Sequence, residues 1–298
     1  MGLKEKVAQT ILSNTVRPKR RKFGVEIESF YYKRGTIERI PVNDENCFSA
    51  SKLLESVNSA VNANSQYSYS LEPGGQLEWA SGPSTSLWEI KNQFDENILI
   101  QEKLCKSNEI DIGYFSVEPV SMPFDIRLID SEKYRLMNDL FLKRGNLGPW
   151  MMRNTTSIQI NIDFTDEEDA SQMAFVADAI QPLMSIMFSN SPFMNAKPTR
   201  ENLRWKIWGN TDNSRCGSLY DHSINTPKNF VEKYAEWLLQ RDVIFLDNMD
   251  GTFSAFDGNF GDMISLREDD RLIFSAFRQI FTHVRFKNVL EVRASDRQ

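Results

Sequence analysis

This chain of 298 residues is long enough to bury a substantial core, as one large domain or as two. With 41% hydrophobic and 26% charged residues its composition is that of a soluble enzyme, and a net charge of −6 argues against a general nucleic-acid-binding protein, whose surface carries a basic patch. Three widely spaced cysteines and two histidines exclude a disulfide framework, a zinc pattern and a histidine-rich metal site. No apolar run approaches the roughly 20 residues of a membrane span, so we expect a cytoplasmic protein with neither nucleic acid nor membrane as a partner.

The first half of the chain combines short strands with two helices. Residues 1–22 predict a helical or disordered leader, whose basic run is expected to be a solvated approach to the first strand. Alternation around Gly24 predicts that strand, and the turn Pro73-Gly74-Gly75 predicts a hairpin. Strands are predicted at 22–30, 66–71, 76–80, 110–117 and 151–164, and helices at 49–62 and 86–106.

The second half begins with a long helix. Thr165 is expected to cap a helix that runs to Phe188, because acidic residues follow in its first turn, where they favour the helix dipole. Further helices are predicted at 199–208 and 226–240, and further strands at 242–247, 252–255 and 284–292. This mixture predicts an α+β fold with a mainly antiparallel sheet, and no linker divides the chain.

Five glutamates lie on or beside predicted strands. Glu26 and Glu28 are two residues apart, so they point to the same face of their strand. Glu72 and Glu78 flank the Pro-Gly-Gly turn, and Glu291 lies on the last strand. A sheet face lined with acids is costly unless cations neutralise it, and oxygen ligands without histidine or thiolate suit Mg²⁺. The alternative is that they are solvent-facing glutamates of a half-exposed sheet.

Five arginines lie in apolar or uncharged surroundings: Arg153, Arg204, Arg215, Arg285 and Arg293. Guanidinium groups bind carboxylates and phosphates through two parallel hydrogen bonds. Together with Mg²⁺-binding acids they would suffice to position a nucleoside triphosphate for phosphoryl transfer, although each one alone could form an ordinary surface ion pair. The sequence contains no Walker loop.

Nucleophilic catalysis has little support. Cys216 follows Arg215, which could lower the pKa of its thiol, but a catalytic cysteine also needs a histidine base, and only His222 and His283 are available. Both histidines are expected to be structural.

Taken in order, these motifs resemble the glutamate–cysteine ligase family of the plant and proteobacterial type. The most specific is Ser70-Leu71-Glu72-Pro73-Gly74-Gly75-Gln76-Leu77-Glu78. The other matching segments are 24–28, 145–148, 151–164, 188–193, 204–208, 211–212, 284–285 and 290–293. The resemblance spans about residues 20–297.

The resemblance implies a glutamine-synthetase-like fold, in which a curved, mainly antiparallel sheet with flanking helices forms a funnel, as a single catalytic domain over 23–298. It also implies Mg²⁺ and the substrates ATP, L-glutamate and L-cysteine, joined through a γ-glutamyl phosphate as the first step of glutathione biosynthesis.

The same resemblance assigns roles to residues of this chain. The expected metal ligands are Glu26, Glu28, Glu72, Glu78 and Glu291. Arg204 and Trp208 are expected to bind the glutamate substrate, and Gln159 and Asn161, on one face of their strand, to line the floor of the funnel. Arg293 is expected to contact the γ-phosphate, with Arg285 and Arg153 as further catalytic cations.

Two departures from the family pattern produce alternatives. The chain ends at Gln298, directly after the last motif, whereas family members continue, which predicts a fragment or a shortened enzyme. The cysteine pairs that regulate plant members have no counterpart here, so no thiol switch is expected. The alternatives are a related carboxylate–amine ligase with another amine acceptor, and a non-catalytic homologue that binds glutamate or nucleotide. A monomer or a homodimer is expected.

Overall fold

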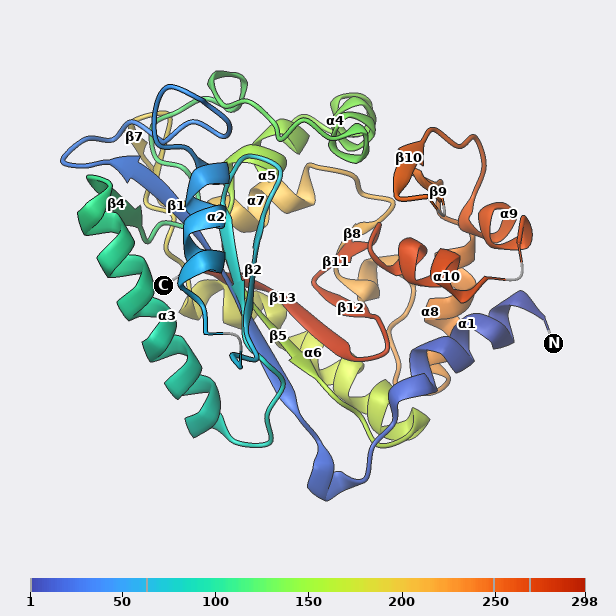
Figure 1. The fold of residues 1–298 in the computed structure, drawn as a ribbon. Coiled ribbons are helices and arrows are strands. Elements are labelled where there is room, and N and C mark those ends of the chain that lie inside the picture. Colours follow the sequence, from blue (N-terminus) through green and yellow to red (C-terminus); the bar gives the residue numbers. More distant parts are fainter. Residues whose placement is uncertain (1, 63, 249, 268, 298) are drawn as a thin grey trace.

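A seven-stranded antiparallel sheet forms the centre of the molecule (Figure 1). The computed structural model describes residues 2–62, 64–248, 250–267 and 269–297. The strand order is β12-β13-β5-β1-β3-β2, and β4 pairs with the distal half of β1. The strands are β1 Phe23–Lys33, β2 Ser68–Leu71, β3 Leu77–Ala80, β4 Ile110–Gly113, β5 Ser157–Ile162, β12 Val284–Phe286 and β13 Leu290–Asp296. The sheet is open, and the predicted α+β class with a mainly antiparallel sheet is confirmed.

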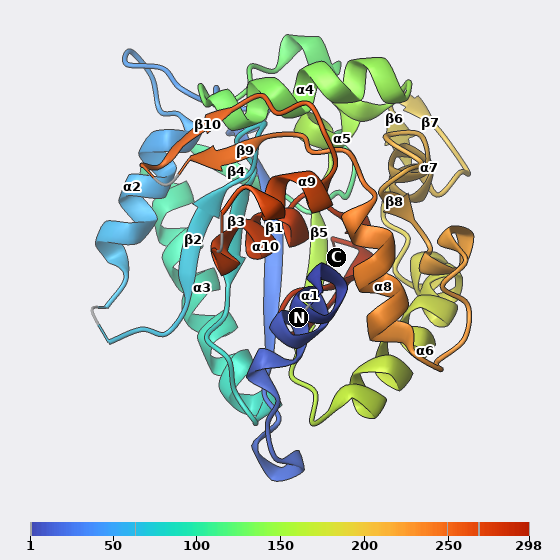
Figure 2. The same cartoon turned by 90° about the vertical axis from the view of Figure 1, so that its right-hand side faces the viewer.

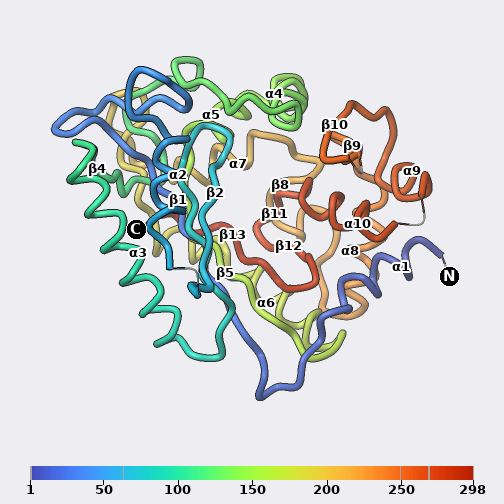
Figure 3. Tube along the Cα trace, viewed as in Figure 1, coloured from blue at the N-terminus to red at the C-terminus, as the bar shows by residue number. Residues whose placement is uncertain are grey.

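Three small two-stranded sheets complete the strand inventory of the described residues. They are β6 Phe193–Met194 with β7 Lys197–Pro198, β8 Cys216–Gly217 with β11 Phe281–Thr282, and β9 Leu246–Asn248 with β10 Thr252–Ser254. The β9–β10 hairpin packs beside helix α4, at the end of the sheet that carries the β2–β3 turn (Figure 3).

Helices flank the sheet on its sides and at one end (Figure 2). Helix α2 packs on β2, α3 packs on β4, and α6 packs on β12 and β13. The helices are α1 Leu3–Ile11, α2 Ala50–Ala60, α3 Leu87–Ser107, α4 Glu132–Arg144, α5 Gly148–Asn154, α6 Glu167–Met187, α7 Leu203–Gly209, α8 Phe230–Leu239, α9 Phe260–Ser265 and α10 Asp270–Phe277. Among the residues described, no helix combines the length and the apolar character that crossing a membrane requires.

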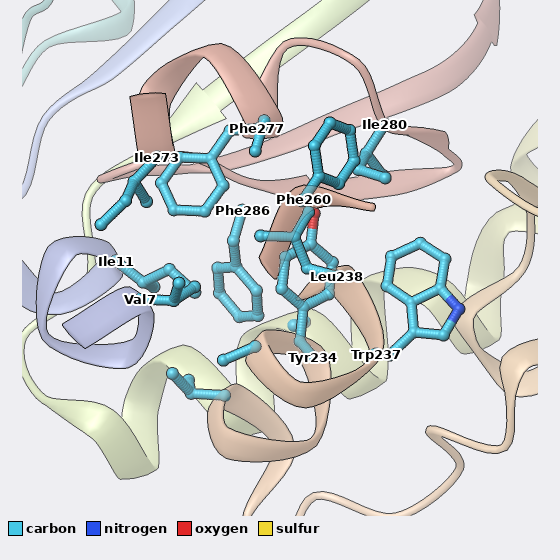
Figure 4. Packing of buried hydrophobic residues seen from close by; sticks show 14 of the residues in the cluster. Val7, Ile11, Tyr234, Trp237, Leu238, Phe260, Ile273, Phe277, Ile280 and Phe286 are labelled. Atoms are coloured by element: carbon cyan, nitrogen blue, oxygen red, sulfur yellow. The ribbon is translucent and has the colours of Figure 1, made fainter. Parts of the chain in front are cut away.

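The largest apolar core lies where α1, α8, α9 and α10 meet the end of the sheet (Figure 4). Phe286 on β12 is fully buried there, and its ring makes edge contacts with Phe164, Phe230 and Tyr234 at centroid distances of 6.1, 6.3 and 5.2 Å. The leader is helical, the first of the two predicted possibilities. Its α1 buries Val7 and Ile11 completely in this core.

Truncating Phe286 to alanine is expected to lower the free energy of unfolding by about 3–5 kcal/mol, because the loss of a buried ring leaves a cavity in close-packed surroundings. Chemical denaturation monitored by circular dichroism measures this change. Phe193→Ala is the matched control, since the side chain of Phe193 is 41% exposed. Equal losses in the two variants would contradict the assignment of Phe286 to the core.

Two predicted strands are wrong in part. The segment 151–154 belongs to α5, because Pro149 starts a helical turn and apolar side chains on all sides of that turn pack against α4 and α7. The predicted strand 284–292 is the hairpin β12–β13, whose turn is closed by a hydrogen bond from the Lys287 N–H to the Val289 carbonyl, 2.9 Å.

Smaller differences concern the ends of elements. Asp166, rather than Thr165, caps α6, because its carboxylate accepts the Asp169 N–H at 2.9 Å. Helix α7 starts only at Leu203, where Asn202 supplies the cap. The remaining bounds differ from the predicted ranges by a few residues, and helices α4, α9 and α10 have no counterpart among the predictions.

Candidate active site

One face of the central sheet collects polar side chains from four adjacent strands. In antiparallel pairs, residues directly opposite each other point to the same face. The register pairs Glu28 with Glu78, Glu26 with Gln159, and Asn161 with Glu291. The two-residue spacing within β1 and within β5 therefore aligns acids and amides, as the sequence predicted, while residues such as Ile27 and Ile158 point to the other face.

The turn between β2 and β3 brings a third carboxylate to this face. The turn is closed by hydrogen bonds from the Gly75 N–H to the Glu72 carbonyl, 2.8 Å, and from the Glu72 N–H to the Gln76 carbonyl, 2.9 Å. Gly75 has a φ of +80°, a conformation that glycine adopts without strain. The buried amide of Gln76 ties the turn to the end of α5 by donating to the Thr155 carbonyl at 2.9 Å.

Glu28, Glu72 and Glu78 form a compact acidic cluster. One carboxylate oxygen from each lies within 4.8 Å of the other two. Burial, and after it the charge of Glu72, raises the pKa of Glu28 to about 8. Burial also raises the pKa of Glu72 and of Glu78, and the charge of Glu72 adds to the effect on Glu78. One buried and two half-buried carboxylates with raised pKa values are what a site for a hard divalent cation presents in the absence of its ion, so these residues fit Mg²⁺.

The cluster makes stability depend on pH when no metal is bound. A carboxyl whose pKa is raised on folding stabilises the fold fully below its unfolded pKa and loses this contribution as pH rises through its folded pKa. For Glu28 this interval runs from 4.5 to about 8. The melting temperature of the metal-free protein is therefore expected to fall by a few degrees from about pH 5 to about pH 8.

Adding Mg²⁺ is expected to reverse this decline, because an ion that binds only the folded state stabilises it. Scanning calorimetry across the pH range with EDTA and with Mg²⁺ measures both effects, and Glu28→Gln should flatten the metal-free slope. A slope that is the same in the variant would contradict the role of Glu28.

Positive charge gathers beside the acids, on the β12–β13 hairpin. Although burial alone would raise the pKa of Glu291, the cations Arg285, Arg293 and Lys287 hold it well below its usual range. Arg285 donates from Nε and Nη2 at 2.5 and 3.0 Å, Lys287 lies at 2.6 Å and Arg293 at 2.9 Å. Glu291 thus anchors three cations along one edge of the site.

Gln159 connects the two charged groups. Its side-chain N–H donates to Glu28 at 2.9 Å, and its side-chain oxygen accepts from Arg293 at 2.6 Å. A single buried amide on β5 therefore sets both a carboxylate of the acidic cluster and a guanidinium of the cationic group. The sequence predicted that Gln159 lines the floor of the funnel. It did not predict that this amide bonds both Glu28 and Arg293.

Arg204 and Trp208 of α7 close the same region from the side. Arg204 donates to the Arg293 carbonyl at 3.0 Å, and both guanidinium groups lie over the Trp208 ring, at 5.7 Å for Arg204 and 5.8 Å for Arg293. The Arg204 Nε and the Trp208 Nε1 are buried without a hydrogen-bond partner among the described residues. Unsatisfied donors of this kind are costly, which favours an anionic ligand that accepts from them.

A cavity of about 320 Å³ opens between these groups. Nine of the twelve site residues predicted from the sequence line it: Glu26, Glu28, Glu72, Glu78, Gln159, Arg204, Trp208, Arg285 and Arg293. The lining also includes residues that were not predicted from the sequence: Lys133 and Tyr134 on α4, Asp247 and Phe253 on β9–β10, Arg278 directly after α10, and Lys287. Lys133 and Tyr134 lie on α4, a helix that was not predicted, so nothing in the sequence linked them to the site. Lys287, four residues before Glu291, could have been suspected from charge complementarity.

Three predicted site residues do not line this cavity. The side chain of Arg153 turns away from it and donates from Nε to the Ile126 carbonyl at 3.1 Å. Asn161 supports Glu26, donating to its carboxylate at 2.8 Å, and lines a smaller neighbouring pocket. Glu291 is fully buried beneath its three cations, an environment that repels a divalent metal ion. These contacts give no support to Arg153 as a catalytic cation or to Glu291 as a metal ligand.

The environment of Cys216 does not favour nucleophilic catalysis by its thiol, for which the sequence also gave little support. The thiol of Cys216 is buried, and burial raises its pKa to about 12. Its neighbour Arg215 is fully buried and donates to Asp212 at 2.8 Å, so its charge is already neutralised.

Comparisons with known proteins agree on one family. A family model described as glutamate–cysteine ligase family 2 matches residues 22–298. The chloroplastic glutamate–cysteine ligase of Nicotiana tabacum is 28% identical over 98% of this chain and 59% of its own length. The chloroplastic glutamate–cysteine ligase A of Oryza sativa subsp. indica is 29% identical over 92% of this chain and 58% of its own length.

Among solved structures, the glutamate–cysteine ligase of Francisella tularensis in complex with AMP is similar at 14% identity and a TM-score of 0.49, covering 93% of this chain and 61% of that chain. The chain therefore spans less than two thirds of the length of the relatives that it matches.

Proposed function

Because the chain belongs to glutamate–cysteine ligase family 2, we propose that it is an ATP-dependent ligase that joins the γ-carboxylate of L-glutamate to the amine of L-cysteine. The observation that carries this proposal is the pairing, across one cavity, of a three-carboxylate cluster with a group of arginines, linked by the Gln159 amide. Phosphoryl transfer needs both kinds of charge, one to hold the metal and one to neutralise the phosphoryl oxygens.

Glu28, Glu72 and Glu78 are the residues that would hold Mg²⁺, and Glu26 lines the cavity beside them. When bound, Mg²⁺ supplies charge neutralisation for the phosphates of ATP. The protein's contribution is the fixed placement of the carboxylates on β1 and β3 and in the turn between β2 and β3, which avoids reorganisation during the reaction.

The first chemical step is transfer of the γ-phosphoryl group of ATP to the γ-carboxylate of glutamate, which yields ADP and a γ-glutamyl phosphate. Arg293 and Arg285, which line the cavity, would stabilise the negative charge that the phosphoryl oxygens carry in the transition state. The buried carboxylate of Glu291 keeps both guanidinium groups oriented.

Arg204 would bind the α-carboxylate of glutamate. Its partnerless Nε and the Nε1 of Trp208 are donors available to that anion. An ion pair of this kind fixes the amino-acid end of the substrate and so leaves the γ-carboxylate to reach the phosphoryl group.

In the second step the amine of cysteine attacks the acyl carbon of the γ-glutamyl phosphate, phosphate leaves, and the nitrogen loses a proton to give the amide. No protein nucleophile takes part, in agreement with the buried, protonated thiol of Cys216. Apolar side chains including Met151, Met152 and Phe281 line part of the cavity and offer a surface for the acceptor.

Phosphate release from ATP by the 298-residue chain tests the proposal. With Mg²⁺ and glutamate present, turnover is expected to require an amine and to prefer cysteine over 2-aminobutyrate and alanine. Preference for a different amine would assign a sister ligase activity, and binding of ATP and glutamate without phosphate release would assign a non-catalytic homologue. The cytoplasmic location and the monomeric or homodimeric state stay predictions from the sequence.

A further inference from the structure

Arg39 lies outside the cavity, on the far side of the turn that carries Glu72. It forms an isolated bridge with Tyr32 at the end of β1, and its guanidinium lies 4.6 Å from the centroid of the Phe30 ring. The residues lining the active-site cavity do not include it. It lines a separate pocket instead, and so it does not contact the active-site cavity.

The guanidinium of Arg39 joins the β2–β3 turn to the end of α5, in addition to the bond that Gln76 makes between them. One terminal nitrogen donates to the Gly74 carbonyl at 2.8 Å, and the other donates to the Arg153 carbonyl at 2.9 Å. Gly74 is the tip of the turn after Glu72, and Arg153 lies at the end of α5. A planar fork that satisfies both carbonyls fixes the separation between turn and helix more firmly than one flexible bond would.

The turn is pressed closely against α5 at this point. A Cβ added at Gly74 would lie 2.6 Å from the Cα of Arg153 and 2.8 Å from its carbonyl oxygen. On the cavity side, the same contact is held by Gln76, which accepts the Gly74 N–H at 3.0 Å and donates to the Thr155 carbonyl at 2.9 Å. The turn is thus held from both sides, by an amide within the cavity wall and by Arg39 behind it.

We propose that Arg39 is a positioning residue for the divalent-cation site: by clamping Gly74 to Arg153, it holds Glu72 at the distance from Glu28 and Glu78 that metal binding needs. The inference rests on the proposed function for the identity of the acidic cluster as a cation site. Strand pairing fixes Glu28 and Glu78 relative to each other, whereas the position of Glu72 depends on the turn between β2 and β3. Glu72 is therefore the carboxylate whose position depends most on residues outside the cluster.

Mn²⁺ binding followed by electron paramagnetic resonance tests the inference without any need for turnover. Arg39→Met keeps a long side chain but removes both donors, and its dissociation constant for Mn²⁺ is expected to rise by about 10–100-fold, the usual effect of losing a residue that supports a metal ligand. Arg39→Lys keeps the charge but cannot reach both carbonyls, so an intermediate rise is expected.

Arg34→Met is the matched control. Arg34 likewise donates to backbone carbonyls, to Cys105 at 2.8 Å and to Ile110 at 3.4 Å, but it has no contact with the turn or with α5. Its affinity for Mn²⁺ is expected to equal that of the wild type even though its melting temperature falls. The comparison shows whether Mn²⁺ affinity depends on the bonds from Arg39 to Gly74 and Arg153, or falls whenever an arginine that bonds backbone carbonyls is removed.

The outcomes distinguish the inference from the proposed function. Wild-type affinity in folded Arg39→Met would overturn the inference and leave the ligase proposal standing; if that variant does not fold, wild-type affinity in Arg39→Lys has the same meaning. If neither the wild-type chain nor Glu78→Gln binds Mn²⁺, both the inference and the metal part of the proposed function are overturned.

Discussion

Replacing Glu78 by glutamine is expected to lower ligase turnover by at least about 100-fold, because a neutral amide cannot supply the charge with which the cluster holds its metal ion, and a bound metal ion stabilises the transition state by several kcal/mol. Glu78 lies opposite Glu28 in the β1–β3 pairing and shares the site with Glu72. Steady-state phosphate release at increasing Mg²⁺ concentrations is the measurement. The activity is expected to remain low even at saturating metal.

The same substitution is expected to have the opposite effect on the metal-free fold. Burial and the neighbouring carboxylates raise the pKa of Glu78, so ionising it above neutral pH costs free energy that the amide does not incur. Metal-free Glu78→Gln should therefore melt at a higher temperature than the wild type at alkaline pH, while Glu55→Gln, at an exposed position on α2, changes neither property. Full turnover in Glu78→Gln would exclude Glu78 from the metal site.

Replacing Arg293 by methionine is expected to reduce kcat by about 1,000-fold, the lower end of the contribution that an arginine makes when it neutralises a transferring phosphoryl group. Arg293 lines the cavity and is set by Gln159 and Glu291. The KM for glutamate is expected to change much less, because the interaction strengthens as the transition state forms.

Two features make this variant interpretable. Glu291 keeps Arg285 and Lys287 as partners, so the substitution does not leave its buried charge unpaired. Arg241→Met provides the control, since Arg241 is held by hydrogen bonds to the Trp237 and Ser214 carbonyls and lies outside the cavity lining. A variant that retained kcat and lost only affinity for glutamate would show that Arg293 binds the ground state and not the phosphoryl group.

Period-two spacing made the floor of the site predictable from the sequence. Glu26 and Glu28 on one strand and Gln159 and Asn161 on another had to share faces, whatever the fold around them. The Pro-Gly-Gly turn between two short strands also left little choice about the hairpin that carries Glu72. The sequence pattern is sufficient to predict the position of a site residue where the geometry of a single strand or turn decides which way its side chain points.

Other features depend on contacts between segments far apart in the chain. The sequence around Arg153 has strand-like neighbours, yet a proline at the start of the segment and apolar packing on all sides make it helical and turn the guanidinium away. Glu291 is a different case: it was assigned to the metal from the family resemblance, although the three cations that surround it lie within six residues of it on the same hairpin. Lys133 was missed because α4 meets the cavity only through the tertiary fold.

The length of β1 has a consequence for the dynamics of the site. Its first half is bonded on both sides, to β3 and β5, and its second half is bonded to β4. Amide hydrogens of such a central strand exchange with solvent only when most of the domain opens, whereas those of a turn exchange through local opening. The backbone that carries Glu26 and Glu28 on β1 is therefore expected to exchange its amide hydrogens slowly, and the turn that carries Glu72 is expected to exchange them faster. A bound ion should therefore slow amide exchange at the turn far more than along β1, because Glu72 is the carboxylate of the cluster whose position depends on the turn.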